Sequence, residues 1–194
     1  MHRFTSPLVA LTGLLYSSAA LAGWTVDDQQ SRLSFVSIKA GTIAEVHHFE
    51  QLNGTLTDDG RFSLTIDLNS VETLIPIRNE RMRDQLFDTA RFPNAVLNSR
   101  LDLAAVHALD IGEQTRLDAE AQLELVGQSS TLTVQAVVAR LSDQQLLVTS
   151  AQPLTLNAIS LGLGDGVEQL REVAGLPSIS PAVPVTFQLT LSAD

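Results

Sequence analysis

The chain has 194 residues, contains no cysteine and carries a formal net charge of −10 at pH 7. The lack of cysteine excludes disulfide bonds, thiolate metal sites, a cysteine nucleophile and lipid modification of a cysteine. The acidic balance argues against nucleic acid as a partner. It also argues against docking on anionic membranes through basic residues, because both interactions need clustered cations.

Residues 1–22 are predicted to be a cleavable secretory signal peptide. Arg3 supplies the positive start, an apolar core follows, and Ala20-Leu21-Ala22 fits an A-x-A cleavage site. Cleavage there leaves residues 23–194, which are enough for one domain with a substantial core. The apolar stretch is too short for a transmembrane helix and no second one follows, so no stable membrane insertion is expected.

Short strands with period-two alternation fill the first part of the mature chain. A strand is predicted at about residues 32–38, and Ala40 and Gly41 interrupt the alternation after it. The turn that ends at Gly60 predicts a hairpin between two further strands. The strand after that turn is the clearest, and its single buried face favours antiparallel pairing. Its apolar residues, which alternate strictly with polar ones, are Phe62, Leu64, Ile66 and Leu68.

The stretch at residues 70–93 interrupts the strands and holds the densest charge in the chain. Pro76 and Pro93 punctuate it, so one helix should not cover all of it. A short helix over about residues 79–87 fits, because Met82 and Leu86 lie four apart on one face. We expect this helical insertion to lie across one end of a β structure.

Strand alternation returns after the insertion and continues to the end of the chain. Asp165 and Glu168 have the spacing of a capping box and predict a second short helix, which Gly175 ends. The sequence therefore predicts a single all-β domain of roughly eight antiparallel strands, a barrel or a sandwich, with two short helices. The alternating segments of this second part lie at about residues 95–101, 117–125, 132–140, 146–156 and 183–191.

The charged stretch contains Ser-Val-x-Thr, then Arg-Asn-Glu-Arg-Met, then Leu-Phe-Asp, then Phe-Pro before a strand. This order resembles the signature region of the YceI-like family. The resemblance covers about residues 24–191 and implies an eight-stranded antiparallel lipocalin-like barrel in a periplasmic protein that binds long apolar lipids such as polyisoprenoids. Where the family usually has Arg-Asp, this chain has Arg78-Asn79, although Asn can still cap a helix. The matching positions are Ser70, Val71, Thr73, Arg78, Glu80, Met82, Phe87, Asp88, Phe92 and Pro93.

The inward faces of the predicted strands are aliphatic, which leaves two alternatives open. They form an ordinary packed core, or they surround a channel, since a barrel of about eight strands is just wide enough for one small ligand. The small inward residues Ala119, Ala121 and Ala136 favour a cavity slightly, and the resemblance implies a lipid tunnel. The residues predicted to line it are Phe35, Phe62, Leu64, Ile66, Leu68, Met82, Leu86, Phe92, Leu97, Leu117, Leu123, Val134 and Phe187.

Arg78 is predicted to meet the lipid head group, because the family motif singles it out and a guanidinium fork suits oxyanions. For Arg81, Arg83 and Arg91 a solvated surface is the preferred interpretation, since nearby acidic residues can pair with them for little gain.

No metal site, cofactor or catalytic residue is predicted. His47 and His48 are neighbours in a strand and therefore point to opposite faces, and no spacing typical of a metal site is present. The motifs of serine hydrolases, zinc proteases and nucleotide-binding enzymes are missing, although a triad can assemble from distant positions.

The sequence thus predicts a periplasmic carrier, not an enzyme, that holds a long-chain apolar lipid in the barrel interior. The lipid is a polyisoprenoid, an isoprenoid quinone or a fatty-acyl derivative. Two alternatives stay open: a lipid-modifying enzyme, which needs ionisable residues facing the interior, and an envelope stress-related protein-interaction module, which needs a filled core. The oligomeric state is left open, with a homodimer as one alternative.

Overall fold

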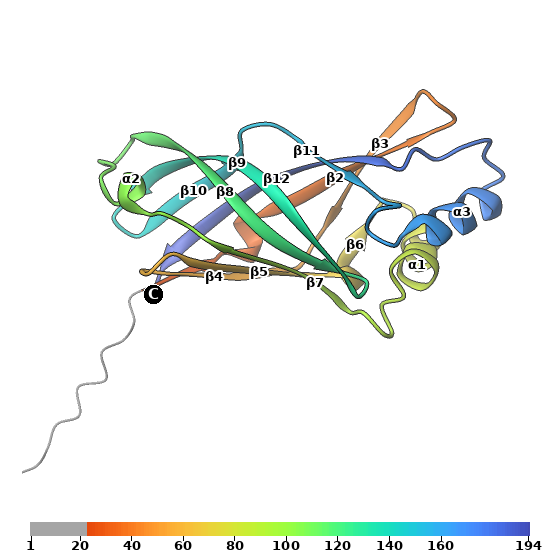
Figure 1. Cartoon of the computed structure of the whole chain (residues 1–194), viewed down its shortest axis with the longest axis horizontal. Helices are drawn as coiled ribbons and strands as arrows, with labels where there is room; N and C mark the ends of the chain where they lie inside the picture. Colours follow the sequence, from red (N-terminus) through yellow and green to blue (C-terminus); the bar gives the residue numbers. More distant parts are fainter. Residues whose placement is uncertain (1–22) are drawn as a thin grey trace, which may run out of the picture.

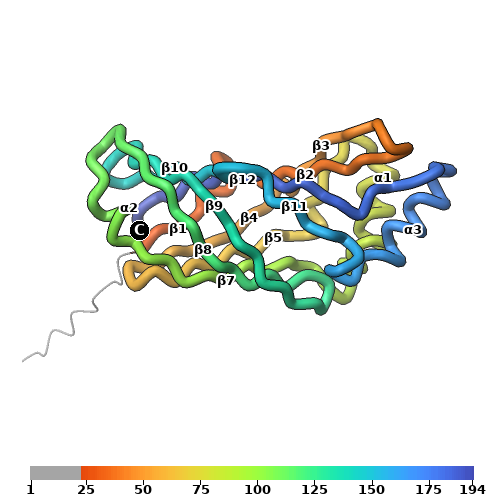
Figure 2. The backbone as a smooth tube through the Cα atoms, turned by 45° about the horizontal axis from the view of Figure 1, so that its top comes forward, coloured from red at the N-terminus to blue at the C-terminus, as the bar shows by residue number. Residues whose placement is uncertain are grey.

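The computed structural model describes residues 23–194, so the predicted signal peptide lies outside the described residues. Twelve strands join one antiparallel sheet, and consecutive strands that lie in line together make a closed eight-stranded barrel (Figures 1 and 2). The strands are β1 (Gly23–Val26), β2 (Arg32–Lys39), β3 (Ile43–Phe49), β4 (Leu52–Thr57), β5 (Arg61–Asp67), β6 (Val71–Glu72), β7 (Asn94–Arg100), β8 (Gln114–Leu125), β9 (Gln128–Ser142), β10 (Gln145–Ser150), β11 (Leu154–Asn157) and β12 (Ala182–Ala193).

The barrel closes because β12, the last strand, pairs with the first strands of the chain. Trp24 of β1 lies opposite Ala193, and Phe35 of β2 lies opposite Val185. β1 and β2 form one wall strand that a short 3₁₀ turn, η1 (Asp28–Gln30), interrupts. β3 with β4, β5 with β6, and β10 with β11 form wall strands in the same way. The spatial order therefore follows the sequence, and the predicted antiparallel lipocalin-like barrel is confirmed.

Three helical segments lie together at one end of the barrel, which is the right end in Figure 1. They are α1 (Pro76–Arg81), the π-helical segment η3 (Met82–Phe87) and α3 (Gly164–Val173). The predicted helical insertion is confirmed, but its start at residue 79 is wrong, because the helix begins at Pro76. Proline fits the first helical turn, where its missing N–H would have no helical partner.

The second predicted helix exists, but its predicted start is wrong. α3 begins at Gly164 with Leu163 at the N-cap position, and no side chain caps it, so the capping box at Asp165 is not formed. Gly175 ends the helix as predicted, with a φ of 63° and its N–H donated to the Glu172 carbonyl at 3.0 Å. A further helix that the sequence did not indicate, α2 (Ala104–His107), covers the other end of the barrel.

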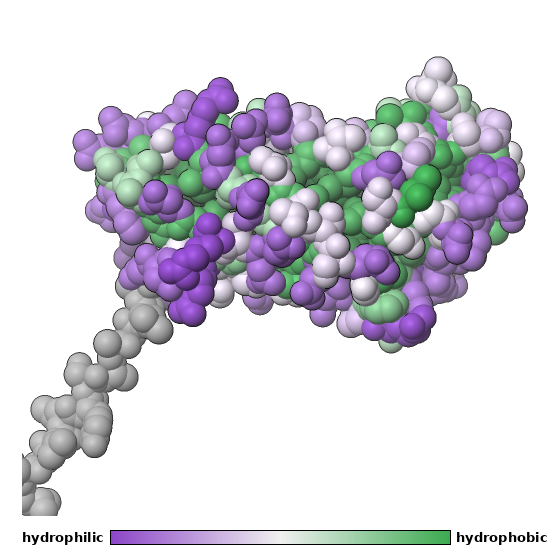
Figure 3. All heavy atoms as spheres, in the orientation of Figure 1, coloured by the Kyte–Doolittle hydropathy of each residue, from purple (hydrophilic) through white to green (hydrophobic). Residues whose placement is uncertain are grey.

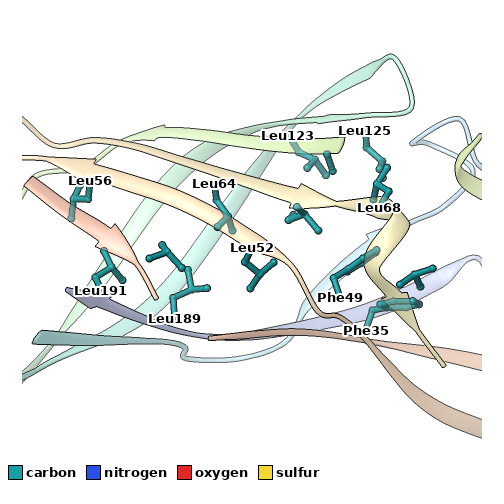
Figure 4. Packing of buried hydrophobic residues seen from close by; sticks show 14 of the residues in the cluster. Phe35, Phe49, Leu52, Leu56, Leu64, Leu68, Leu123, Leu125, Leu189 and Leu191 are labelled. Carbon is teal, nitrogen blue, oxygen red and sulfur yellow. The ribbon is translucent and has the colours of Figure 1, made fainter. Parts of the chain in front are cut away.

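Inward side chains of the strands form the hydrophobic interior. Leu64 and Leu123 point into it from neighbouring parts of the wall, and Leu56 and Leu191 both lie near one end (Figure 4). Phe35 and Phe49 lie at the other end of the same view, with ring centroids 5.4 Å apart. Within residues 23–194, no helix is long and apolar enough to cross a membrane.

We expect Gly166→Ala to destabilise the helical end of the barrel. A β-carbon at Gly166 would lie 2.6 Å from the Gln85 carbonyl oxygen and 2.9 Å from the Leu86 Cα atom, so α3 would have to move away from η3. Overpacking of this kind costs about 1–3 kcal/mol. The free energy of unfolding, measured by urea denaturation, should fall by that amount.

Gly164→Ala is the matched control in the same helix. The nearest atom to its added β-carbon would be 3.6 Å away, which is ordinary contact. Its stability should stay the same or rise by up to about 1 kcal/mol through helix propensity. Equal stabilities of the two variants would show that the close approach of α3 to η3 does not hold this end together.

Candidate functional site

The barrel interior contains a cavity of about 480 Å³, and nearly all of its surface is apolar. Every sequence-predicted lining residue except one borders it. The prediction for Phe92 is corrected: it precedes β7 and packs beneath the β8–β9 turn, where a β-carbon on Gly127 would lie 3.2 Å from the ring. The predicted residues that do border the cavity are Phe35, Phe62, Leu64, Ile66, Leu68, Met82, Leu86, Leu97, Leu117, Leu123, Val134 and Phe187.

The sizes of the inward side chains explain why the interior is not filled. Ala119, Ala121 and Ala136 come from adjacent positions of β8 and β9 and border the cavity. Leu117 and Val134 face the same space and remain only partly buried, because no side chain fills the volume beside them. The structure therefore has the internal void that a filled-core interaction module would lack.

Burial distinguishes an open end of the cavity from a closed one. Leu103 and Val106, beside and in α2, are only 7% and 5% exposed. At the opposite end, Ile75 and Ile77 border the cavity and are 43% and 51% exposed. The cavity therefore opens beside α1 and the β2–β3 hairpin.

The inner face of the β2–β3 hairpin changes from apolar to charged toward this opening. Along β2 the inward residues are Phe35, Ser37 and Lys39, and along β3 they are Phe49, His47 and Glu45. These residues all face inward because every second side chain of a strand points to the same face. An otherwise apolar cavity thus ends in a polar mouth.

Glu45 stands at the centre of the polar mouth, between two cations. Lys39 Nζ and Arg78 Nη1 each lie 2.7 Å from its Oε2 atom. The hydrogen bond from Lys39, with added attraction from Arg78, holds the pKa of Glu45 below its usual value. Arg78 also donates to the Thr73 carbonyl at 2.6 Å. These contacts tie α1 to the β2–β3 hairpin across the opening.

His47 lies just inside the mouth and is 2% exposed. Its Nε2 atom is 2.9 Å from Ser37 Oγ, and its Nδ1 atom is buried without a partner. The ring packs edge-on against Phe35, with the centroids 5.3 Å apart. Burial is the main cause that lowers the pKa of His47, and the positive charge of Arg78 is the second. The imidazole is therefore neutral at neutral pH.

The arginines of the helical insertion divide between the cavity and the surface. Arg78 and Arg81 border the cavity, whereas Arg83 donates to the Asn69 carbonyl at 3.4 Å. Arg91 pairs with Asp88 at 3.2 Å and lies over the Phe92 ring. The preferred interpretation of Arg81 as a solvated surface residue is therefore corrected, because α1 turns it toward the mouth.

Asn79 does not cap a helix but braces the turn before α1. It is 7% exposed, and its Oδ1 atom accepts hydrogen bonds from the Thr73 hydroxyl at 2.5 Å and the Thr73 N–H at 2.9 Å. Its Nδ2 atom donates to Glu72 at 3.0 Å. A carboxylate could make the first two contacts but not the third, so the amide suits a position beside Glu72.

Ionisable groups do meet at the mouth, as a lipid-modifying enzyme would require, but Glu45 and His47 do not form a pair. Glu45 is held by Lys39 and Arg78 and does not orient His47, whose Nδ1 atom has no partner. Among residues 23–194, no three His, Cys, Asp or Glu side chains are grouped to hold a metal ion. His47 and His48 point to opposite faces of β3, as predicted.

Several residues of the site were missed by sequence reasoning. Ser37 lies on the strand predicted at about residues 32–38, whereas Lys39 lies just beyond that range and Glu45 lies on β3. The alternation along β2 and β3 could have shown that these polar residues face inward. By contrast, Leu154 and Leu156 of β11, and Val167 and Leu170 of α3, border the cavity because of tertiary folding.

Comparisons with known proteins agree with this architecture. The family profile of the YceI-like domain matches residues 24–191. A polyisoprenoid binding domain from Saccharophagus degradans, implicated in plant cell wall breakdown, is 41% identical, with 88% of this chain and 98% of that chain covered and a TM-score of 0.86.

Two more distant structures share the fold. Burkholderia cenocepacia BcnA is 18% identical, with 85% of this chain and 98% of that chain covered and a TM-score of 0.67. A Campylobacter jejuni YceI protein is 10% identical, with coverages of 76% and 84% and a TM-score of 0.56. The comparison with curated proteins found no significant match.

We expect His47→Gln to reduce the acid sensitivity of folding. The pKa of His47 in the folded protein lies below 6.5, so below about pH 6.5 the unfolded chain binds a proton that the folded protein does not. As the pH decreases below about 6.5, the free energy of unfolding should therefore decrease, by at most about 1.4 kcal/mol per pH unit. Urea denaturation between about pH 7 and about pH 5 measures this slope.

His48→Gln is the control for this measurement, because His48 lies on the other face of β3. His47→Gln should flatten the slope more than His48→Gln does. The same slope in the wild type and in His47→Gln would contradict the assignment of a buried, neutral imidazole at the mouth.

Proposed function

The chain belongs to the YceI-like family, and from this premise we propose that it binds a long-chain apolar lipid in its barrel interior and acts as a carrier. The observation that carries the proposal is the cavity of about 480 Å³, which is apolar along its length and open at one end. The similarity to a polyisoprenoid binding domain, at 41% identity, supports a polyisoprenoid chain as the ligand. An isoprenoid quinone or a fatty-acyl derivative has the same apolar character.

The size of the cavity is consistent with useful affinity. At about 30 Å³ for a group the size of a water molecule, the volume accommodates about fifteen chain carbons. Burying them contributes roughly 12 kcal/mol at about 0.8 kcal/mol each. Association costs at least about 4 kcal/mol. The remainder, at most about 8 kcal/mol, allows binding up to micromolar affinity without any strong polar contact.

We infer that the head group of the lipid lies at the polar mouth. Arg78, which the sequence assigned to this role, borders the cavity together with Lys39 and Arg81. Their N–H donors suit an oxygen-bearing head, whereas the apolar chain fits the deeper space. The ligand would therefore enter chain first, with its head beside α1.

The proposed role is binding, without a chemical step. Glu45 at the mouth is paired with two cations. Apart from His47, three serines and the cations of the mouth, the other residues that border the cavity are apolar. We place the protein in the periplasm, on the basis of the signal sequence predicted at residues 1–22.

The direct test is lipid extraction and native mass spectrometry of protein purified from its own host. We expect a stoichiometric isoprenoid or fatty-acyl ligand. A cavity that is always empty, together with no uptake of a polyprenol, a quinone or a fatty-acid probe, would overturn the proposal.

We expect Ala136→Phe to block lipid uptake. Ala136 is 5% exposed and borders the cavity, so a phenyl ring there takes the place of several chain carbons. At about 0.8 kcal/mol for each carbon displaced, affinity for a polyprenol should fall at least about tenfold. Fluorescence titration measures the change, with circular dichroism to confirm the fold.

Ala139→Phe is the matched control, because Ala139 lies on the outer face of the same strand, β9. Its polyprenol affinity should equal that of the wild type. Equal loss in both variants would mean that the ring disturbs the wall and does not fill the cavity.

We expect Arg78→Gln to weaken binding of a polyprenyl phosphate more than binding of the uncharged polyprenol. A hydrogen bond to a charged group is worth about 1.5–3 kcal/mol, so the phosphate should lose roughly tenfold or more in affinity. Arg91→Gln is the control, because Arg91 lies outside the cavity. Equal losses for both lipids would remove Arg78 from the head-group role.

A further inference from the structure

A patch of exposed apolar side chains surrounds the open end of the cavity. We define this rim patch as Ile43, Val46, Leu74, Ile75 and Ile77, whose exposures range from 43% for Ile75 to 85% for Leu74. Figure 3 shows hydrophobic surface at this end, near the β2–β3 hairpin. Isolated exposed apolar residues are normal, but a group of five beside one opening indicates an interaction surface.

The rim patch takes its residues from two separate segments, β3 and the turn into α1, which the fold holds side by side. β3 pairs with β6, which places residue 74 just beyond the partner of His48. The ion pair between Arg78 and Glu45 then holds the start of α1 against β3. Val46 and Leu74 therefore lie on the same side of this end of the barrel.

The patch continues into the cavity itself. Ile75 and Ile77 border the cavity and are also exposed outside it, whereas Ile43, Val46 and Leu74 do not border the cavity. A chain that leaves the cavity would thus pass directly from apolar interior to apolar rim. A rim of this kind fits a partner that has its own apolar interior.

The backbone at Leu74 is held in an unfavourable conformation that presents its side chain outward. Its φ is 63°, in the left-handed region, which is unfavourable for a residue with a β-carbon. The Glu72 carboxylate accepts the Leu74 N–H and is itself held by Asn79. Strain that the surrounding contacts maintain is typical of functional positions.

The charges near the patch are far closer to balance than those of the whole protein. Around the mouth, the charges of Lys39, Arg78 and Arg81 offset those of Glu45, Glu72 and Glu80, and α3 at the same end adds a net charge of −2, whereas the chain as a whole carries a net charge of −10. An acidic body is repelled by an anionic membrane surface, and a nearly neutral, apolar end is repelled much less. The distribution of charge therefore favours approach to a bilayer with the rim patch foremost.

We propose that the rim patch docks the protein reversibly on the surface of a lipid bilayer, with the cavity mouth facing the acyl chains. The lipid would then pass between membrane and cavity without crossing water. This inference rests on the proposed function, because it takes the ligand to be a membrane lipid. Insertion of a few apolar side chains gives weak, reversible binding, since affinity grows with the apolar area buried.

The test is flotation of the full mature chain with zwitterionic phosphatidylcholine vesicles. We expect the wild type to float with the vesicles, with little dependence on salt, because the contact is apolar. The double variant Leu74→Asn/Val46→Thr should lose at least about tenfold in vesicle binding. Asn adopts the left-handed region more readily than Leu, so the turn should keep its shape.

The matched control is Ile111→Asn/Leu141→Thr, which removes two exposed apolar side chains that flank the Gly112–Arg140 backbone hydrogen bond, close in the chain to α2. It should bind vesicles like the wild type. Transfer of a polyprenol between two vesicle populations should slow in the rim variant and stay unchanged in the control. Uptake of the same polyprenol from detergent solution should be equal in all three proteins.

Vesicle binding that is equal in the rim variant and the wild type would overturn the proposal, as would a wild type that does not float. A wild type that self-associates through this patch, shown by sedimentation, would assign it to a second copy of the chain and also overturn it. Failure of uptake from detergent would instead contradict the proposed function, because that measurement involves no membrane.

Discussion

Closure of the hydrogen-bonded wall is the constraint on which the rest of this structure depends. β12 pairs with β10 on one side and with β1 and β2 on the other, so the sheet has no free edge along this seam. In a closed barrel, alternate side chains of every strand must face the interior, whatever their size. The volume inside is then set by the wall, and the side chains either fill it or leave a void.

Both outcomes occur in the same barrel. At the end that α2 covers, the side chains close the space, and Leu103 and Val106 are only 7% and 5% exposed. Farther along, small residues such as Ala119 and Ala136 leave the space that their neighbours cannot reach. The cavity is therefore a consequence of residue size at inward positions, not of any break in the wall.

The open end differs from the rest because two kinds of structure meet there. The β2–β3 hairpin brings Lys39 and Glu45 to the mouth, and α1 brings Arg78 across to pair with them. Outside these charges lies the apolar rim, and inside them lies the apolar cavity. A polar mouth between two apolar regions matches a lipid, whose head and chain have opposite preferences, and it links the proposed cargo to the proposed docking on a bilayer.

The sequence by itself determined the architecture and the direction of most interior side chains. Strict alternation, as from Phe62 to Ile66, fixes which face is buried, and the motif at residues 70–93 identifies the family. Helix starts were less well determined, because Pro76 both ends an extended segment and begins a helix, and because Asp165 has capping chemistry that the fold does not use. Phe92 was misplaced because the alternation resumes only after Pro93.

Tertiary structure alone decided that the interior is hollow and where it opens. Periodicity shows that Leu117 and Val134 face inward, but not whether another side chain reaches them from the opposite wall. The partnership of Glu45 with Lys39 and Arg78 joins residues from β3, β2 and α1. Such contacts depend on how the fold brings together segments that are far apart in the chain. Local sequence patterns carry no information about which of these segments become neighbours in space.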